Sequence, residues 1–179
     1  MRLTPADLLE RQRQIRLLIL DVDGVLTDGS LFLGDGGEQY KAFNSRDGHG
    51  IRMAQDGGLE IAILTGRNSE VVTHRMRDLG VRHILQGRRD KRTALIELLT
   101  QTGFAPEHSA FVGDDIVDIP AMRQVALGIA VGDAHPLVLE HADWHTLAPG
   151  GRGAVREVCE TLLAAQDRLE GILHAYLES

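Results

Sequence analysis

Short apolar runs that end in glycine, aspartate or threonine recur along this chain and constrain its fold more than any other feature. Runs of three to five apolar residues bounded by turn residues are typical of strands buried on both faces. Between them lie helical patterns, and strands that alternate with helices predict βαβ units. We therefore expect an α/β fold, with a Rossmann-like parallel sheet and helices on both faces. The runs are Leu17–Leu20, Ile61–Leu64, Ala110–Val112 and Leu127–Val131, with a weaker one at His83–Leu85.

One segment departs from this alternation. Two short extended stretches flank the glycines of Gly34–Gly37 and predict a β-hairpin over residues 31–43, too small to be a second domain. Near the other end, a glycine-rich breaker precedes apolar residues at helical spacing from Ala154 onward, which predicts one helix to the end of the chain. We expect residues 1–179 to form a single domain, in which residues 31–43 are a flap and residues 150–179 a tail and helix.

Charge and composition exclude several classes of function. The formal net charge is −7 and only 4% of the residues are aromatic, so neither phosphate neutralisation nor base stacking supports nucleic-acid binding. No apolar stretch is long enough to cross a membrane, and the charged N-terminus does not resemble a signal peptide. The lone Cys159 has no partner for an internal disulfide. These features predict a cytoplasmic protein with no membrane contact.

Polar side chains follow each of the predicted strands. In an open parallel sheet, ligands bind outside the carboxyl ends of the strands, so these residues are expected to meet at one site. They are Asp21 and Asp23 after the first strand, Thr65 and Arg67 after the second, Lys91 after the third, and Asp114, Asp115 and Asp118 after the fourth.

This set of residues suits the chemistry of phosphate esters. Carboxylates of Asp21, Asp23 and Asp114 packed together would repel one another unless a divalent cation compensates, and oxygen ligands of this kind are what Mg²⁺ prefers. The hydroxyl of Thr65 and the ammonium of Lys91 can bind phosphoryl oxygens. A carboxylate can also be a covalent nucleophile that forms an aspartyl-phosphate. We expect Asp115 and Asp118 to support this site from behind, as helix cap or near the metal.

Four segments in this order resemble the motifs of the haloacid dehalogenase superfamily of phosphatases. They are Asp21–Gly29 (DVDGVLTDG), Leu64–Arg67 (LTGR), Lys91, and Gly113–Asp115 (GDD). The hairpin, Phe43–Ile51 and Gly150–Glu157 extend the likeness over nearly the whole chain, which resembles more narrowly the 3-deoxy-D-manno-octulosonate 8-phosphate phosphatase family.

The resemblance implies an activity and a set of roles. The chain would be a Mg²⁺-dependent phosphatase with a small flap in place of a large cap domain, and a homotetramer that makes a lipopolysaccharide precursor. Its substrate would be a phosphorylated sugar acid. Asp21 would be the nucleophile, Asp23 the general acid and base, and Thr65, Gly66 and Lys91 the phosphate ligands. Mg²⁺ would bind Asp21, the backbone carbonyl of Asp23, and Asp114. The residues that would either read the sugar acid or lie solvated on the surface are Asn44, Arg46, Arg67 and Arg152, the last reaching a neighbouring subunit's site.

Three other functions stay open on the sequence. The nearest is a phosphatase for a nine-carbon, sialic-acid-type 9-phosphate. A phospho-receiver domain uses similar residues, but it places its acidic pair on the first strand and its acceptor aspartate on a later one. Here Asp23 follows Asp21 at the end of the first strand, which favours turnover. The third is a regulatory domain without catalysis, which the complete set of catalytic residues disfavours.

Overall fold

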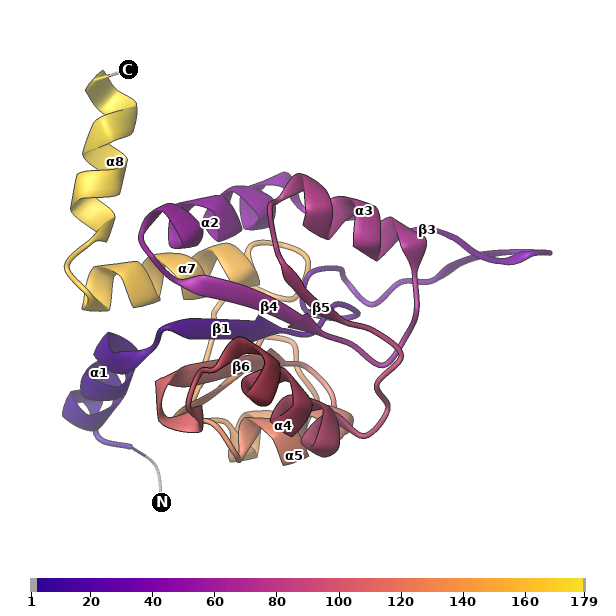
Figure 1. The fold of residues 1–179 in the computed structure, drawn as a ribbon, viewed down its shortest axis with the longest axis horizontal. Helices are drawn as coiled ribbons and strands as arrows, with labels where there is room; N and C mark the ends of the chain where they lie inside the picture. Colours follow the sequence, from indigo (N-terminus) through magenta and orange to yellow (C-terminus); the bar gives the residue numbers. More distant parts are fainter. Residues whose placement is uncertain (1–2, 179) are drawn as a thin grey trace.

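The computed structural model describes residues 3–178, apart from the side chains of residues 38 and 39. The ends of the predicted 1–179 domain, residues 1–2 and 179, therefore lie outside the described residues. Figure 1 shows the arrangement. The strands are β1 (Leu17–Leu20), β2 (Phe32–Gly34), β3 (Gly37–Tyr40), β4 (Glu60–Leu64), β5 (His83–Leu85), β6 (Ser109–Gly113), β7 (Leu127–Ala130) and β8 (Trp144–His145). The α-helices are α1 (Pro5–Gln14), α2 (Ser45–Asp56), α3 (Glu70–Asp78), α4 (Lys91–Thr102), α5 (Ile119–Met122), α6 (Pro136–His141), α7 (Ala154–Ala165) and α8 (Leu169–Glu178).

A parallel sheet of six strands forms the centre of the molecule, in the order β5-β4-β1-β6-β7-β8. In this sheet β1 is central and pairs in parallel with β4 on one side and β6 on the other. All four of its residues are buried, because helices cover both faces of the sheet. Figure 1 shows α2, α3 and α7 on one face and α4 and α5 on the other. The predicted α/β fold is confirmed.

The sequence pattern missed several elements, including α2 and β8. The helix α2 contains Gly48 and Gly50, and its first half has no apolar stripe, so periodicity did not reveal it. The strand β8 is only two residues long and pairs with the edge of β7. Neither element changes the fold class, but α2 supplies much of the surface against which α7 packs.

The C-terminal segment is two helices, so the prediction of one continuous helix is wrong. The helix α7 ends at Ala165, and Asp167 in the short link to α8 adopts a left-handed φ of 57°. The backbone N–H of Arg168 donates to the carbonyl of Leu163 (2.9 Å), and its side chain donates to the carbonyl of Gly57 (2.5 Å). The helix α7 buries seven residues in the core, whereas α8 buries none and projects from the body. The apolar spacing continues through the break, so periodicity alone did not show it.

The predicted hairpin is confirmed as a small two-stranded sheet of β2 and β3, with no further domain attached to it. Its strands are shorter than predicted, and residues 41–43 lead out of it toward α2. The hairpin projects from the body at the carboxyl ends of the parallel strands (Figure 1). Its apolar side chains are exposed, including Phe32 (51%), Leu33 (66%) and Tyr40 (68%). Within residues 3–178 we find no helix with the length and apolar character needed to span a membrane.

Candidate active site

The loop after β1 carries the first two aspartates into the site. The N–H of Asp21 donates to the carbonyl of Val112 on β6 (3.1 Å), which ties the loop to the neighbouring strand. Gly24 has a φ of +87°, and a Cβ at this position would lie 2.0 Å from Oδ2 of Asp114. A glycine is therefore required here, both for the backbone conformation and for the close approach of Asp114.

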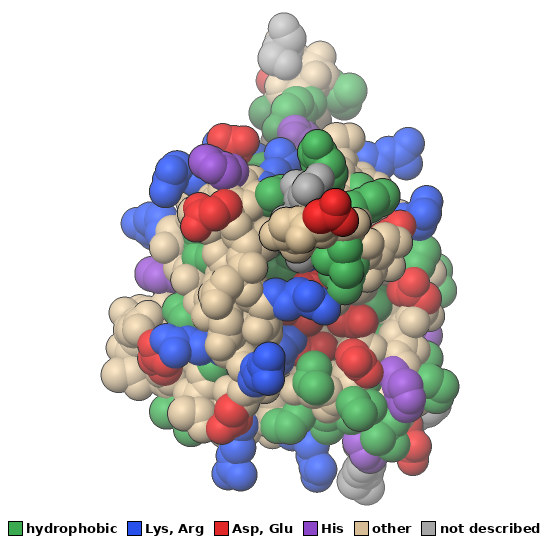
Figure 2. Space-filling model, turned by 90° about the vertical axis from the view of Figure 1, so that its right-hand side faces the viewer, with side chains coloured by type: hydrophobic (Ala, Val, Ile, Leu, Met, Phe, Trp, Pro, Cys, Tyr) green, Lys and Arg blue, Asp and Glu red, His purple; other side chains and the backbone are tan. Residues whose placement is uncertain are grey.

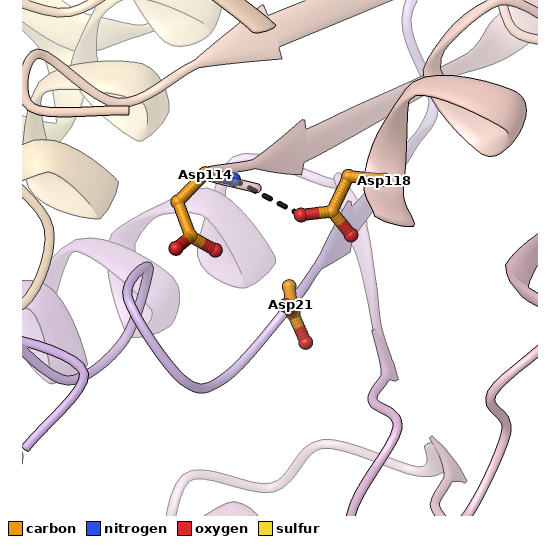
Figure 3. Close-up of side chains that lie close together, drawn as sticks. All are labelled: Asp21, Asp114 and Asp118. Atoms are coloured by element: carbon orange, nitrogen blue, oxygen red, sulfur yellow. Dashed lines mark hydrogen bonds between the residues drawn. The ribbon is translucent and has the colours of Figure 1, made fainter. Parts of the chain in front are cut away.

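Three carboxylates meet at the ends of β1 and β6. Ligand oxygens of Asp21, Asp114 and Asp118 lie within 4.8 Å of one another (Figure 3). Asp118 is fully buried, and its Oδ2 accepts hydrogen bonds from the backbone N–H groups of Asp114 (3.0 Å) and Asp115 (3.2 Å). By contrast, Oδ1 of Asp21 and Oδ1 of Asp114 are buried with no hydrogen-bond partner among the described residues. Unsatisfied buried carboxylate oxygens in such a cluster fit a divalent cation such as Mg²⁺.

Lys91 supplies the positive charge of this cluster. It is the first residue of α4, whose N-terminus is capped by the side chain of Asp90, and it is 4% exposed. Its ammonium lies 2.7 Å from Oδ2 of Asp21 and also donates to Asp118. Burial lowers the pKa of Lys91, but the carboxylates of Asp21 and Asp118 outweigh burial and raise it overall. Lys91 therefore stays cationic, as an anion-binding residue must.

Without a metal ion, the carboxylates of Asp114 and Asp21 are unfavourably placed for negative charge. Burial raises the pKa of Asp114 from 3.8 to about 8, and the nearby charges of Asp118 and Asp21 add to the effect. Burial likewise raises the pKa of Asp21 to about 6, although the ammonium of Lys91 opposes it. A bound divalent cation would favour the ionised forms of both groups, which is a second reason why the cluster suits a metal.

These pKa shifts predict how pH acts on the metal-free protein. Because Asp114 and Asp21 hold their protons more tightly in the folded state, the free energy of unfolding should fall as pH rises from about 4 to about 8. The raised pKa of Lys91 stabilises the folded state equally throughout this window, and that stability is lost only above its ordinary value of 10.5. Excess Mg²⁺ should flatten the dependence.

Thermal unfolding of EDTA-treated protein across this pH range measures the effect. The variant Asp114→Asn is the control, because it lacks the group with the largest shift and should show a shallower slope. An EDTA-treated wild type whose unfolding temperature rises steadily over the same range would contradict the prediction.

A pocket of about 440 Å³ opens over this cluster at the carboxyl ends of the strands. Figure 2 faces this end of the molecule and shows acidic side chains gathered in a hollow with basic side chains beside them. Thr65 is buried at the end of β4, where its N–H donates to the carbonyl of Leu85 (3.0 Å). The pocket is lined by Asp21, Asp23, Gly29, Thr65, Gly66, Arg67, Arg89, Lys91, Asp114, Asp115 and Val117.

The structure thus brings most of the predicted site residues together. Asp118 lies beneath the pocket and not on its wall, because its oxygens are engaged by Lys91 and by backbone N–H groups. Asp115 caps the short turn Ile116–Asp118, where its carboxylate accepts from the N–H of Ile116 (2.7 Å), and it also borders the pocket. Arg67 borders the pocket with its Nε 3.6 Å from Oδ2 of Asp23.

Three predicted substrate contacts lie away from the pocket of this chain. Asn44 caps α2 and donates through Nδ2 to the carbonyl of Gly151 (3.3 Å). Arg46 is exposed on the first turn of α2. Arg152 pairs with Asp28 (3.3 Å) on the outside of the catalytic loop. Contact of these residues with the substrate stays a prediction.

The segment 150–153 packs on the loop that follows β1 in its own chain, which we call the catalytic loop (residues 21–29). The N–H of Gly151 donates to the carbonyl of Val25 (2.8 Å), and a Cβ on Gly150 would lie 1.7 Å from the carbonyl oxygen of Gly24. In this chain the segment therefore braces the Gly24–Asp28 turn from behind. Contact of this segment with a neighbouring subunit's site stays a prediction.

Two basic residues at the site had no role in the sequence prediction. Arg89 lines the pocket next to the predicted Lys91. Lys41, at the end of the hairpin, forms an ion pair with Asp23. Arg89 could have been found from its place two residues before Lys91. For Lys41, 18 residues from Asp23 in the sequence, no local pattern gave a signal.

Comparison with known proteins agrees with the geometry. A family model described as haloacid dehalogenase-like hydrolase matches residues 80–155. The 3-deoxy-D-manno-octulosonate 8-phosphate phosphatase of Escherichia coli K12 is 52% identical over 165 residues, which cover 92% of this chain and 88% of that protein. The chain belongs to the 3-deoxy-D-manno-octulosonate 8-phosphate phosphatase family.

Solved structures of this family share the fold. The phosphatase from Yersinia pestis superposes with a TM-score of 0.89 at 50% identity, over 92% of this chain and 89% of that one. The phosphatase from Moraxella catarrhalis gives a TM-score of 0.93 at 37% identity, over 97% and 99%. That structure is a complex with a magnesium ion, a phosphate ion and a KDO molecule. The resemblance inferred from the motifs is confirmed.

Proposed function

We propose that this chain is a Mg²⁺-dependent phosphomonoesterase that hydrolyses 3-deoxy-D-manno-octulosonate 8-phosphate to the free sugar acid and phosphate. The observation that carries the proposal is the buried Asp21, which has one oxygen bound to Lys91 and the other without a hydrogen-bond partner among the described residues, in a carboxylate cluster with Asp114. The identity of the substrate is inferred from relatives in the family, which are named for it. The product is a sugar acid for lipopolysaccharide biosynthesis.

The first half of the reaction transfers the phosphoryl group to the protein. A carboxylate oxygen of Asp21 attacks phosphorus in line, and the bond between phosphorus and the sugar oxygen breaks. Asp23 gives its proton to the departing sugar oxygen, so that no free alkoxide forms. Thr65, the backbone at Gly66, and Lys91 bind the phosphoryl oxygens on the pocket wall, where negative charge is concentrated.

The second half returns Asp21 to its starting state. Asp23, now ionised, takes a proton from a water molecule that attacks phosphorus of the aspartyl-phosphate. The bond between phosphorus and the Asp21 oxygen breaks, which frees the carboxylate and releases phosphate. Mg²⁺ would be held by the carboxylates of Asp21 and Asp114 and the backbone carbonyl of Asp23, and would supply charge stabilisation for the phosphoryl oxygens. Asp118 positions the Asp114 loop and Lys91, because its oxygens already accept hydrogen bonds from both.

A phosphate-release assay over a panel of phosphorylated sugars tests this function. With Mg²⁺ present, we expect the eight-carbon sugar acid 8-phosphate to give the highest kcat/KM. A higher value for a nine-carbon, sialic-acid-type 9-phosphate would favour the rival substrate. Stable phosphorylation of Asp21 by acetyl phosphate, without release of phosphate from any sugar, would favour a receiver domain. No phosphorylation and no release would favour a regulatory domain.

We also infer a homotetramer that works in the cytoplasm. The support within this chain is the hairpin, whose exposed apolar side chains and free strand edges a neighbouring copy would cover. Light scattering should give the mass of four chains of 19.6 kDa each. A fully active species with the mass of one chain would contradict the assembly.

A further inference from the structure

The carboxylate of Asp23 is held from outside its own loop. Among the described residues, no backbone N–H donates to it, and its polar contacts are with Lys41 and Arg67. The contact with Arg67 is long, at 3.6 Å, and the Arg67 side chain is 53% exposed. The contact with Lys41 is a direct hydrogen bond from an ammonium whose side chain is 1% exposed. Lys41 is therefore the stronger constraint on where this carboxylate points.

The position of Lys41 in the chain makes it a firm anchor. It follows β3 directly and precedes Asn44, the N-cap residue of α2, whose side chain accepts from the N–H of Arg46 (2.8 Å). Its backbone thus lies between the hairpin and a helix that packs on the core. A lysine is rarely buried unless its charge is paired, so burial here indicates a specific role for the pair.

We propose that Lys41 is a positioning residue that aims the carboxyl group of Asp23 at the leaving oxygen of the substrate. The inference rests on the proposed function, in which Asp23 passes its proton to that oxygen as the phosphorus–oxygen bond breaks. In this role Lys41 does not touch the reacting atoms and acts through Asp23. Proton transfer requires heavy atoms within hydrogen-bond reach, so a carboxyl group free to rotate loses part of its effect.

The test compares two leaving groups in the variant Lys41→Met. A sugar alkoxide needs a proton in order to leave, whereas 4-nitrophenolate, a weakly basic phenolate, leaves without one. Because kcat/KM covers substrate binding and the steps up to cleavage of the first bond, it includes the donor role of Asp23 and excludes its later role as base. For the sugar acid 8-phosphate we expect a loss of about tenfold to 100-fold in kcat/KM. For 4-nitrophenyl phosphate we expect a loss below about threefold, since no general acid is needed.

Two further variants control for structure and charge. Lys41→Arg keeps a cation and should recover much of the lost activity on the sugar phosphate. Arg82→Met removes a cation that pairs with Glu60 (2.7 Å) at the amino end of the sheet, far from the site. This variant should leave kcat/KM unchanged for both substrates. A misfolded fraction lowers the apparent kcat/KM equally for both substrates and leaves the ratio of the two values unchanged. The variant Lys41→Gln repeats the measurement with a polar side chain.

The outcomes separate the inference from the function on which it rests. Suppose that wild-type protein releases phosphate from the sugar acid phosphate. If Lys41→Met and Lys41→Gln then lower kcat/KM equally for both substrates, or for neither, the positioning role is overturned. If the wild type releases no phosphate from the sugar acid phosphate, the proposed function fails first. A changed ratio between the two substrates, restored by Lys41→Arg, supports both.

Discussion

Replacing Asp21 with asparagine is expected to abolish phosphate release while leaving the fold intact. An amide is close in size to a carboxylate but has no anionic oxygen to attack phosphorus. Loss of a covalent nucleophile of this kind costs on the order of 10⁴-fold or more in kcat. The fold should survive, because burial disfavours the charge on Asp21 and a neutral amide removes that cost. Lys91 also keeps Asp118 as an ion-pair partner.

Phosphate release and thermal unfolding measured on the same preparation check this expectation. Asp56→Asn makes the same chemical change at an exposed position at the end of α2 and should leave activity unchanged. If Asp21→Asn retained most of the wild-type rate, Asp21 would not be the nucleophile. If the variant failed to unfold cooperatively, its inactivity would say nothing about chemistry, and incorporation of phosphate into wild-type Asp21 would have to be tested directly.

Removing divalent cations is expected to have an effect of similar size. Without Mg²⁺, Asp114 and Asp21 hold protons or repel the phosphate, and the charge on the phosphoryl oxygens is balanced by Lys91 and the pocket arginines without a metal. Loss of a metal that contributes several kcal/mol to the transition state corresponds to on the order of 10³-fold in rate. Ca²⁺ should inhibit, because it accepts more ligands than Mg²⁺ and can engage both oxygens of Asp21.

The measurement is phosphate release after exhaustive dialysis against EDTA, followed by titration with Mg²⁺ or Ca²⁺. Recovery of the full rate with Mg²⁺ shows that dialysis did not damage the protein. Undiminished activity in the dialysed protein before any metal is added would refute the metal requirement. Activation by Ca²⁺ to the same rate would contradict the argument from coordination number.

The core of the site was predictable because its residues sit at the ends of strands. Asp21, Thr65 and Asp114 each follow an apolar run, and the ends of parallel strands meet at one edge of a sheet. The loop after β5 delivers Lys91 to the same edge at the start of α4. These predictions needed only strand identification and one rule of topology, so they did not depend on side-chain detail.

Other residues of the site depended on contacts between distant segments. Asp118 was placed near the metal from its spacing, but only the packed structure shows its oxygens already used by Lys91 and by the Asp114 loop. The contact of segment 150–153 with the Gly24–Asp28 turn of its own chain was not predicted, because the two segments lie more than 100 residues apart in the sequence. The break between α7 and α8, at Asp167, was hidden because the apolar spacing continues across it.

The sequence by itself thus determined the parallel sheet, the hairpin and the residues at the strand ends, since these follow from local periodicity and from the order of the elements. Only the tertiary structure decided which partners surround each charged group. The ion pair of Lys41 with Asp23, the buried oxygens of Asp21 and Asp114, and the brace on the catalytic loop all join segments far apart in the chain. Such contacts depend on how the loops pack in three dimensions, and no period or spacing along the chain encodes that packing.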